Sequence, residues 1–196
     1  MAQEPQSAKE LNLKAVQLQE AGKLAEAAEM YRKAIQLSPN GAASHNNLAL
    51  VLKDLDQLEQ AEKEERIALK LRPKRADYHY NLGLILEREN KPDLAEAEFR
   101  EASAASAMDP DFHYRLARVL RPQGKLSEAE QEVKEALMLR PNNGAYHQLL
   151  GDIFLQEKRE EEALNEYKSA EETGGATVAG DVKNKIDYLK QVLKTR

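Results

Sequence analysis

Apolar residues recur along most of the chain at the three- and four-residue spacing of amphipathic helices. In residues 76–89, leucine and isoleucine fall on one side and polar residues on the other, with an aromatic cluster at the start. The same pattern returns 34 residues before and after this stretch. Proline and glycine between such stretches indicate turns. The chain is therefore predicted to be a series of short amphipathic helices with a 34-residue period.

A frame that begins at residue 8 divides the chain into five repeats, 8–41, 42–75, 76–109, 110–143 and 144–177. The eighth position of each repeat is small, and the twentieth and twenty-seventh are always alanine. Alanine accounts for 28 of the 196 residues, so ten positions taken at random would hold about 1.4 alanines. The repeat is therefore real. The positions that define it are Ala15, Ala49, Gly83, Ala117 and Gly151; Ala27, Ala61, Ala95, Ala129 and Ala163; and Ala34, Ala68, Ala102, Ala136 and Ala170.

This pattern resembles the tetratricopeptide repeat (TPR), a helix–turn–helix unit of 34 residues. The resemblance covers residues 8–177 and includes the family's leucine, late aromatic and closing proline sites. It implies an all-α fold, a right-handed α–α superhelix or solenoid of five repeats, in which stacking buries a continuous core and leaves a concave groove. The residues at these further sites are Leu48, Leu82, Leu116 and Leu150; Tyr31, Phe99 and Tyr167; and Pro39, Pro73 and Pro141.

Some residues depart from the family pattern. Glu65 and Val133 stand at the late aromatic site. Ala107 stands where a proline would close the third repeat, so we expect the second helix of that repeat to continue for about one more turn, to Met108. The second helix of the second repeat is crowded with charge, including Glu64 and Glu65. This charge predicts a face that points outward.

The two ends of the chain differ from the repeats. Residues 1–7 are polar and contain Pro5, which predicts disorder. Residues 178–196 predict a final helix over 178–194, with apolar residues at helical spacing and lysines between them. Because end repeats need a polar-backed shield, we interpret it as a capping helix. The alternative is a basic helix on a membrane surface, for which a single tyrosine offers little anchoring.

Composition excludes several classes of protein. Charged residues make up 32% of the chain and aromatic residues 5%, with a net charge of −5. No run approaches the 18 consecutive apolar residues of a membrane span, so no membrane insertion is expected. No repeat is strongly basic, which argues against a nucleic-acid partner.

The chain offers little for catalysis or cofactor binding. It contains no cysteine, which removes disulfides, thiolate metal sites and thiol nucleophiles. Glycine-rich phosphate loops and the common hydrolase and metalloprotease motifs are absent from the sequence. We therefore expect no enzyme activity and no cofactor.

The four histidines of the chain share the fourth position of successive repeats. This is a packing position between first helices in the family, so the simplest interpretation is a row of half-buried core residues. A metal site needs three or four converging ligands, and no carboxylate or second histidine is expected to recur beside them. A second interpretation is that the four equivalent histidines titrate together near neutral pH. They are His45, His79, His113 and His147.

The resemblance implies a binding groove lined mainly by residues of the first helices. We expect an apolar and aromatic strip at its centre and positive charge at one end, which would bind a peptide or partner segment with apolar anchors and an acidic flank. The alternative for the tyrosines is that they only pack against the neighbouring first helix. The candidate residues are Asn46, Leu50, Lys53, Tyr80, Leu84, Tyr114, Arg115, Arg118 and Arg121.

Other functional interpretations stay open. The carboxylate-clamp pattern of chaperone-binding TPR proteins is not supported, because Asp77 or Asp111 stands where that pattern needs a lysine. The chain could instead self-associate into a homo-oligomer through an end helix, or serve as a spacer in a larger protein. The start of the chain lacks the apolar core of a signal peptide, which favours a cytoplasmic protein. It also resembles the mature N-terminus of an exported or periplasmic protein.

Overall fold

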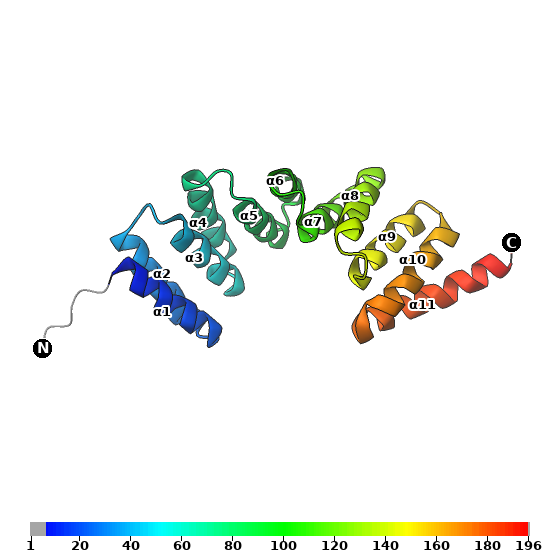
Figure 1. The fold of residues 1–196 in the computed structure, drawn as a ribbon, viewed down its shortest axis with the longest axis horizontal. Helices are drawn as coiled ribbons and strands as arrows, with labels where there is room; N and C mark the ends of the chain where they lie inside the picture. The colour runs from blue at the N-terminus through cyan, green and yellow to red at the C-terminus, as the bar shows by residue number, and fades with distance from the viewer. Residues whose placement is uncertain (1–6, 196) are drawn as a thin grey trace, which may run out of the picture. The chain divides into compact units, whose positions relative to one another are not determined.

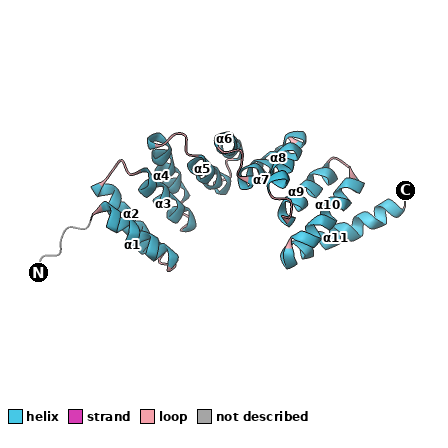
Figure 2. Cartoon of the chain, viewed as in Figure 1, coloured by secondary structure: helices cyan, strands magenta, loops and turns pink. Residues whose placement is uncertain are grey.

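A computed structural model describes residues 7–195, apart from the side chains of residues 176 and 177. The described residues form eleven α-helices and one short 3-10 helix, without a strand among them (Figure 2). The helices fall into two compact parts, the first ending at Ala105 and the second beginning at Ser106. The predicted disorder of residues 1–7 lies outside the described residues, except for Ser7, which caps the first helix.

The first part contains three helical hairpins, in which each helix packs against the next one along the chain (Figure 1). A capping box starts the first helix: the Ser7 hydroxyl accepts from the amide of Glu10, whose side chain accepts from the amide of Ser7. The six helices are α1 (Ala8–Glu20), α2 (Leu24–Leu37), α3 (Ala42–Asp54), α4 (Leu58–Leu71), α5 (Ala76–Arg88) and α6 (Pro92–Ala105).

The second part contains two more hairpins and a final helix that packs against α10 and α9. Asp109 and Asn143 cap the first helices of the two hairpins through their side chains. The elements are α7 (Pro110–Leu120), η1 (Arg121–Gln123), α8 (Leu126–Leu139), α9 (Gly144–Gln156), α10 (Glu160–Thr173) and α11 (Gly175–Lys194).

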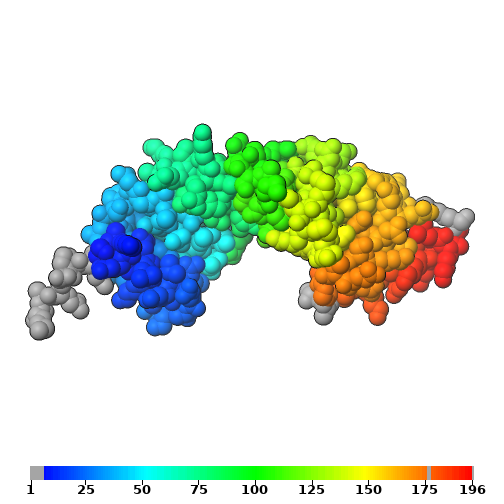
Figure 3. Space-filling view, viewed as in Figure 1, coloured from blue at the N-terminus to red at the C-terminus, as the bar shows by residue number. Residues whose placement is uncertain are grey.

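The small residues of the sequence repeat lie where the helices approach each other most closely. The alanines at the twentieth and twenty-seventh positions are all 0% exposed. An alanine lets two helix backbones approach and loses little conformational entropy on folding, which explains its recurrence. Within each part, side chains fill the spaces between neighbouring helices (Figure 3).

Every repeat turns between its two helices in the same way. The fifteenth position has a positive φ in all five repeats, at Gly22, Asp56, Asn90, Gly124 and Lys158. The next amide then donates to a carbonyl five residues earlier, as from Lys23 to Leu18 at 2.8 Å. This left-handed turn satisfies the last carbonyls of the first helix.

The predicted extension of α6 is wrong. The helix ends at Ala105, the same repeat position at which α4 ends at Leu71. The loop after α6 contains no closing proline and is held by a side chain. A ring nitrogen of His113 lies 3.1 Å from the carbonyl oxygen of Ala107. Asp109 then caps α7. The loop is therefore held by side chains of the following helix.

The final helix begins three residues earlier than predicted, at Gly175 rather than 178. Gly174 and Gly175 join α10 and α11 without a loop. A Cβ atom on Gly174 would lie 2.4 Å from Cβ of Val178, so only glycine fits there. Val182, Ile186 and Leu189 of α11 are buried, whereas Tyr188 is exposed. None of the described helices combines the length and apolar character needed to cross a membrane.

Candidate functional site

The candidate residues divide between the two parts of the chain. Asn46, Leu50, Lys53, Tyr80 and Leu84 lie on α3 and α5 of the first part. All are half-buried except Asn46, which is 8% exposed. The ring of Tyr80 is tilted against the ring of Phe99, with centroids 5.8 Å apart. Tyr80 is therefore held by packing while part of it reaches the surface.

A fully buried carboxyl group lies beneath this face. Glu65 is 0% exposed, and its Oε1 lies 3.0 Å from the side-chain atom of Asn46 that also lies 2.8 Å from Nδ2 of Asn81. Burial raises the pKa of Glu65 to about 8, and the nearby charge of Asp77 adds to the effect while Lys53 opposes it. The predicted outward position of Glu65 is wrong.

A protonated Glu65 accounts for all these contacts. Oδ1 of Asn46 can then accept from both the Glu65 hydroxyl and the Asn81 amide, while Nδ2 of Asn46 donates to Oδ1 of Asn47 at 3.1 Å. An ionised Glu65 can only accept, so the amide nitrogen of Asn46 would have to point toward it. That nitrogen would then face the amide nitrogen of Asn81, and two donors would oppose each other. Glu65 therefore acts as a neutral hydrogen-bond donor at neutral pH.

In the second part, a pocket of about 290 Å³ opens between α7 and α9. Three of the candidate residues, Tyr114, Arg118 and Arg121, line it together with Gln148 and Asp152. The Arg118 guanidinium lies 5.8 Å from the Tyr114 ring centre, and Tyr114 packs against Tyr146 at 4.8 Å between centroids. Arg115 is half-buried on α7 but is not among the lining residues.

The histidines do more than fill space. In each of the four, Nδ1 lies 2.6–2.7 Å from a glutamate 19 residues later, and Nε2 lies 2.9–3.1 Å from a carbonyl oxygen six residues earlier. Each ring therefore lies between two acceptors, a carboxylate on one side and a backbone carbonyl on the other. Each histidine thus joins the preceding loop to the second helix of its own repeat. The glutamates are Glu64, Glu98, Glu132 and Glu166.

The expectation that no carboxylate recurs beside the histidines is wrong. The glutamate always occupies the twenty-third position, in the second helix, and the fold brings it back to the fourth. A search for pairs at a constant spacing across the repeats would have found it.

We expect the His113–Glu132 contact to stabilise the second part. His113→Ala should lower the free energy of unfolding by about 1–3 kcal/mol, because it leaves an acceptor without its donor. Urea unfolding of His113→Ala, Glu132→Ala and the double variant, followed by circular dichroism, should give a coupling energy of about 1–2 kcal/mol. Glu135→Ala, at an exposed position of the same helix, is the control. A coupling energy near zero would mean that His113 only fills space.

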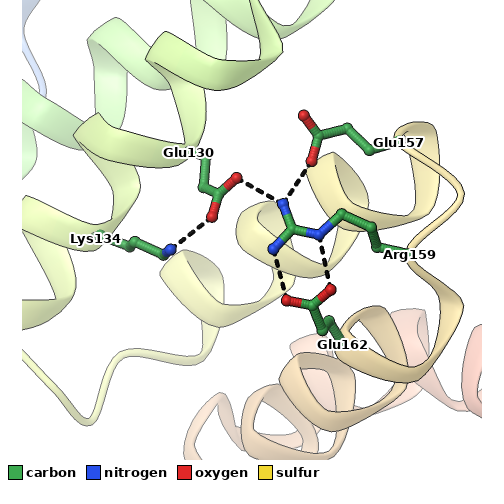
Figure 4. Close-up of polar contacts among 5 residues, drawn as sticks. All are labelled: Glu130, Lys134, Glu157, Arg159 and Glu162. Atoms are coloured by element: carbon green, nitrogen blue, oxygen red, sulfur yellow. Dashed lines mark hydrogen bonds and ion pairs between the residues drawn. The ribbon is translucent and has the colours of Figure 1, made fainter.

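Charged clusters join the later repeat of a pair to the earlier one. Arg159 donates to Glu130, Glu157 and Glu162, and Glu130 also accepts from Lys134 (Figure 4). Burial alone would raise the pKa of Glu130, but the hydrogen bonds from Arg159 and Lys134 outweigh it and lower that pKa.

The first part contains a similar arrangement 68 residues earlier, although Leu94 stands at the position of Glu162. Lys91 contacts Glu62 at 2.8 Å and Glu89 at 2.9 Å, and Arg66 contacts Glu62 at 2.7 Å. Exposed ion pairs add little free energy, so we interpret both clusters as fixing the orientation of adjacent repeats. The pairing of a glutamate with a basic residue four positions later also occurs in the third repeat, where Arg100 donates to Glu96 at 2.9 and 3.0 Å.

The paired helices, the buried alanines and the constant turn define a solenoid of helix–turn–helix repeats. Family models described as tetratricopeptide or TPR repeats match residues 17–56, 46–110 and 86–153. Together these matches run from residue 17 to residue 153. The chain therefore belongs to the tetratricopeptide repeat family, which confirms the resemblance seen in the sequence.

Solved structures with a similar fold are TPR proteins. One is MamA from Desulfovibrio magneticus, with a TM-score of 0.80 and 21% identity over 85% of this chain and 94% of that one. Another is YrrB, described as a TPR protein with an unusual peptide-binding site, with a TM-score of 0.77 and 21% identity over 91% and 92%.

A third is pilF of Pseudomonas aeruginosa, with a TM-score of 0.77 and 20% identity over 96% of this chain and 90% of that one. These identities are low, so the likeness shows the fold alone, and it confirms the predicted all-α solenoid class. No curated protein matches the sequence.

Proposed function

We propose that the chain is a protein-binding scaffold whose first helices bind a peptide or a partner segment. The observation that carries this proposal is the recurrence of half-buried tyrosine on these helices, beside leucine in the first part and arginine in the second. Tyrosine and arginine are the side chains that most often dominate binding energy at interfaces. Both tyrosines rest on a second aromatic ring, which limits the entropy lost when a ligand binds.

The similar structures support the same kind of function. YrrB is described as having a peptide-binding site, and its fold is that of this chain. Arg118 and Arg121 favour a ligand with an acidic segment. We infer that the chain acts by binding rather than by catalysis, because the candidate site offers no nucleophile beside a base.

Peptides selected from a random display library against the whole chain provide the test. Tyr80→Ala with Leu84→Asn, and separately Tyr114→Ala with Arg118→Glu, should weaken the selected peptides at least about tenfold, the loss of one hot-spot contact. Circular dichroism establishes that each variant folds, and fluorescence anisotropy gives the affinity.

The matched control carries Lys63→Glu and Glu135→Lys, at exposed positions of second helices. Affinity that falls with the control and not with the first-helix variants would contradict the proposal. A library that yields no binder would favour the spacer interpretation instead.

Self-association through an end helix is the second candidate. It is favoured by a pocket of about 520 Å³ along α1, which is lined by Asn12, Leu13 and Val16 among others. Leu13 is 61% exposed. Sedimentation velocity over a concentration series, with Leu13→Glu as the variant, distinguishes this candidate from peptide binding.

A further inference from the structure

Three asparagine amides connect the buried Glu65 to the surface of the first part. Asn46 lies at the centre: its Oδ1 accepts from Nδ2 of Asn81 at 2.8 Å, and its Nδ2 donates to Oδ1 of Asn47 at 3.1 Å. Oε1 of Glu65 lies 3.0 Å from the same Oδ1 of Asn46. Asn46 is buried, whereas Asn47 and Asn81 are half-buried, so these contacts run from the interior outward.

An amide has a donor at one end and an acceptor at the other, so each contact fixes the orientation of the next side chain. With a proton on Glu65, its hydroxyl and Nδ2 of Asn81 both donate to Oδ1 of Asn46. Without that proton, Asn46 has to turn its Nδ2 toward Glu65. The turned nitrogen would lie 2.8 Å from Nδ2 of Asn81, so Asn81 has to turn as well and present its Oδ1. Asn47 turns for the same reason, because two oxygens would otherwise meet at 3.1 Å.

The reversal reaches the candidate binding face, which is formed by Leu50, Tyr80 and Leu84. Asn81 follows Tyr80 on α5. Its Nδ2 donates to Asn46, while its Oδ1 takes part in no hydrogen bond with the rest of residues 7–195 and is left for water or a ligand. After the turn, Nδ2 would take the place of Oδ1. The face would then offer a donor where it had offered an acceptor.

The charged groups around Glu65 allow both of its states. Lys53 on α3 favours the ionised form, whereas Asp77 and Tyr78 on α5 oppose it. Asp77 is itself paired with Arg75 at 2.6 Å. Burial is the largest influence and raises the pKa of Glu65 to about 8. A ligand that prefers the ionised state by about tenfold would lower this pKa by about one unit, which brings the change close to neutral pH.

We propose that Glu65 determines the hydrogen-bonding specificity of the candidate binding face, because its proton sets whether Asn81 presents an acceptor or a donor to a ligand. Glu65 itself touches no ligand and is a positioning residue that acts through Asn46. The inference rests on the proposed function for its ligand, a peptide segment whose backbone carries both donors and acceptors. By linkage, a segment that offers an acceptor to Asn81 favours loss of the Glu65 proton, and one that offers a donor favours its retention.

The test follows the asparagine side chains of the whole chain by NMR, with ¹³C and ¹⁵N in asparagine and ¹³C in glutamate. Carbon-detected spectra correlate Cγ with Nδ2 and persist when the amide hydrogens exchange quickly at high pH. The signals of Asn46, Asn47 and Asn81 should move together with the Glu65 carboxyl signal, with one midpoint near pH 8. Asn12, whose Nδ2 donates to Oγ of Ser44 at 2.8 Å, is the control and should not move.

Two variants separate a turned amide from the electric field of a new charge. Glu65→Gln keeps a donor toward Asn46 and cannot ionise, so the three asparagine signals should stay fixed. Asn46→Ala removes the connection, so Asn81 should no longer move when the Glu65 carboxyl group titrates. Movement of Asn81 that persists in Asn46→Ala would overturn the proposal, because an electric field acts without Asn46. Fixed Asn81 signals in the native chain would overturn it too.

Hydrogen exchange detects the turn itself in chains that keep Asn46. The side-chain hydrogens of Asn81 should exchange with water at equal rates in the native chain and in Glu65→Gln at pH 6.5. At pH 8.5 the native chain should exchange them about fivefold faster or more, because Nδ2 has lost its acceptor. Asn12 should exchange equally in both chains.

Equal exchange of Asn81 at both pH values would overturn the proposal, even if Asn46→Ala did not fold. Folded signals that disappear in place of moving would do the same, because Glu65 would then ionise only by unfolding.

These measurements need no partner, so the two proposals fail separately. Selected peptides that depend on Tyr80 and Leu84, alongside fixed Asn81 signals, would refute the role of Glu65 alone. Asn81 signals that follow Glu65, without any effect of the first-helix variants on selected peptides, would refute the proposed function while Glu65 still sets the orientation of Asn81.

Discussion

Glu65→Gln is expected to stabilise the first part of the chain, by an amount that grows as the pH rises. Glu65 is fully buried and its pKa is raised from the usual 4.5 to about 8, first by burial and then by Asp77. Glutamine has the same shape and cannot ionise. It keeps a hydrogen-bond donor facing Asn46 and removes the cost of keeping a carboxyl group neutral.

The sign follows from the protons bound in each state. Between pH 4.5 and 8 the folded chain holds a proton on Glu65 that the unfolded chain has released, so the native stability falls as the pH rises through this range. The slope is roughly 1.4 kcal/mol per pH unit for one proton. Glu65→Gln should therefore match the native chain near pH 4.5 and exceed it by about 3 kcal/mol at pH 7.

Thermal unfolding at pH 5, 7 and 8.5, followed by circular dichroism, measures this effect. For a chain of this size the gain at pH 7 corresponds to a Tm higher by about 6–12 °C. Glu59→Gln, at an exposed position of the same helix, should show no such pH dependence. If Glu65→Gln and the native chain had parallel stability curves across this range, Glu65 would be ionised in the folded state.

Glu65 lowers the stability of the fold near neutral pH, and its contacts suggest why a carboxyl group is kept at this buried position. The same repeat position carries an aromatic residue in three other repeats and Val133 in the remaining one, and all four are fully buried; the aromatic residues are Tyr31, Phe99 and Tyr167. In place of an aromatic ring, Glu65 organises the amides of Asn46 and Asn81 directly beneath the candidate binding face. Buried polar networks often specify one arrangement of the surrounding groups. The loss of stability at Glu65 is consistent with a role in shaping that face.

The repeat architecture could be predicted because it rests on short-range periodicity. Alanine at fixed positions of each repeat forces close helix packing, and the structure buries every one of them. The errors arise where contacts within the fold override a local signal. Because Ala107 stands where other repeats have a closing proline, the sequence predicted that α6 would continue. The helix ends at Ala105, and His113 anchors the loop that follows it.

The candidate site could be predicted only in part, for the same reason. Tyr114, Arg118 and Arg121 share one side of a helix and its following turn, so their meeting in one pocket follows from helical spacing. The contact between Asp152, which lines the pocket, and Lys185 depends on how α11 packs, because Lys185 comes 33 residues later in the chain. Helical periodicity in one segment carries no information about such a contact.

Gly83→Ala is expected to destabilise the first part, although the same change stabilises an ordinary helix interior by about 1 kcal/mol. A Cβ atom on Gly83 would lie 2.5 Å from Cε1 and 2.7 Å from Cδ1 of Phe99. Phe99 is fully buried, so its ring cannot move without disturbing the core. Overpacking of this kind costs about 1–3 kcal/mol, which urea unfolding followed by circular dichroism would detect.

The chain supplies both a rescue and a control for this prediction. The fourth repeat has Ala117 and Val133 at the equivalent positions, both fully buried. Gly83→Ala with Phe99→Val recreates that pair and should lose less stability than the two single changes together, with a coupling of about 1–2 kcal/mol. Gly180→Ala, where the new Cβ would meet nothing within 4 Å, should stabilise α11 instead. If Gly83→Ala behaved like Gly180→Ala, Phe99 would not be the reason for glycine at this position.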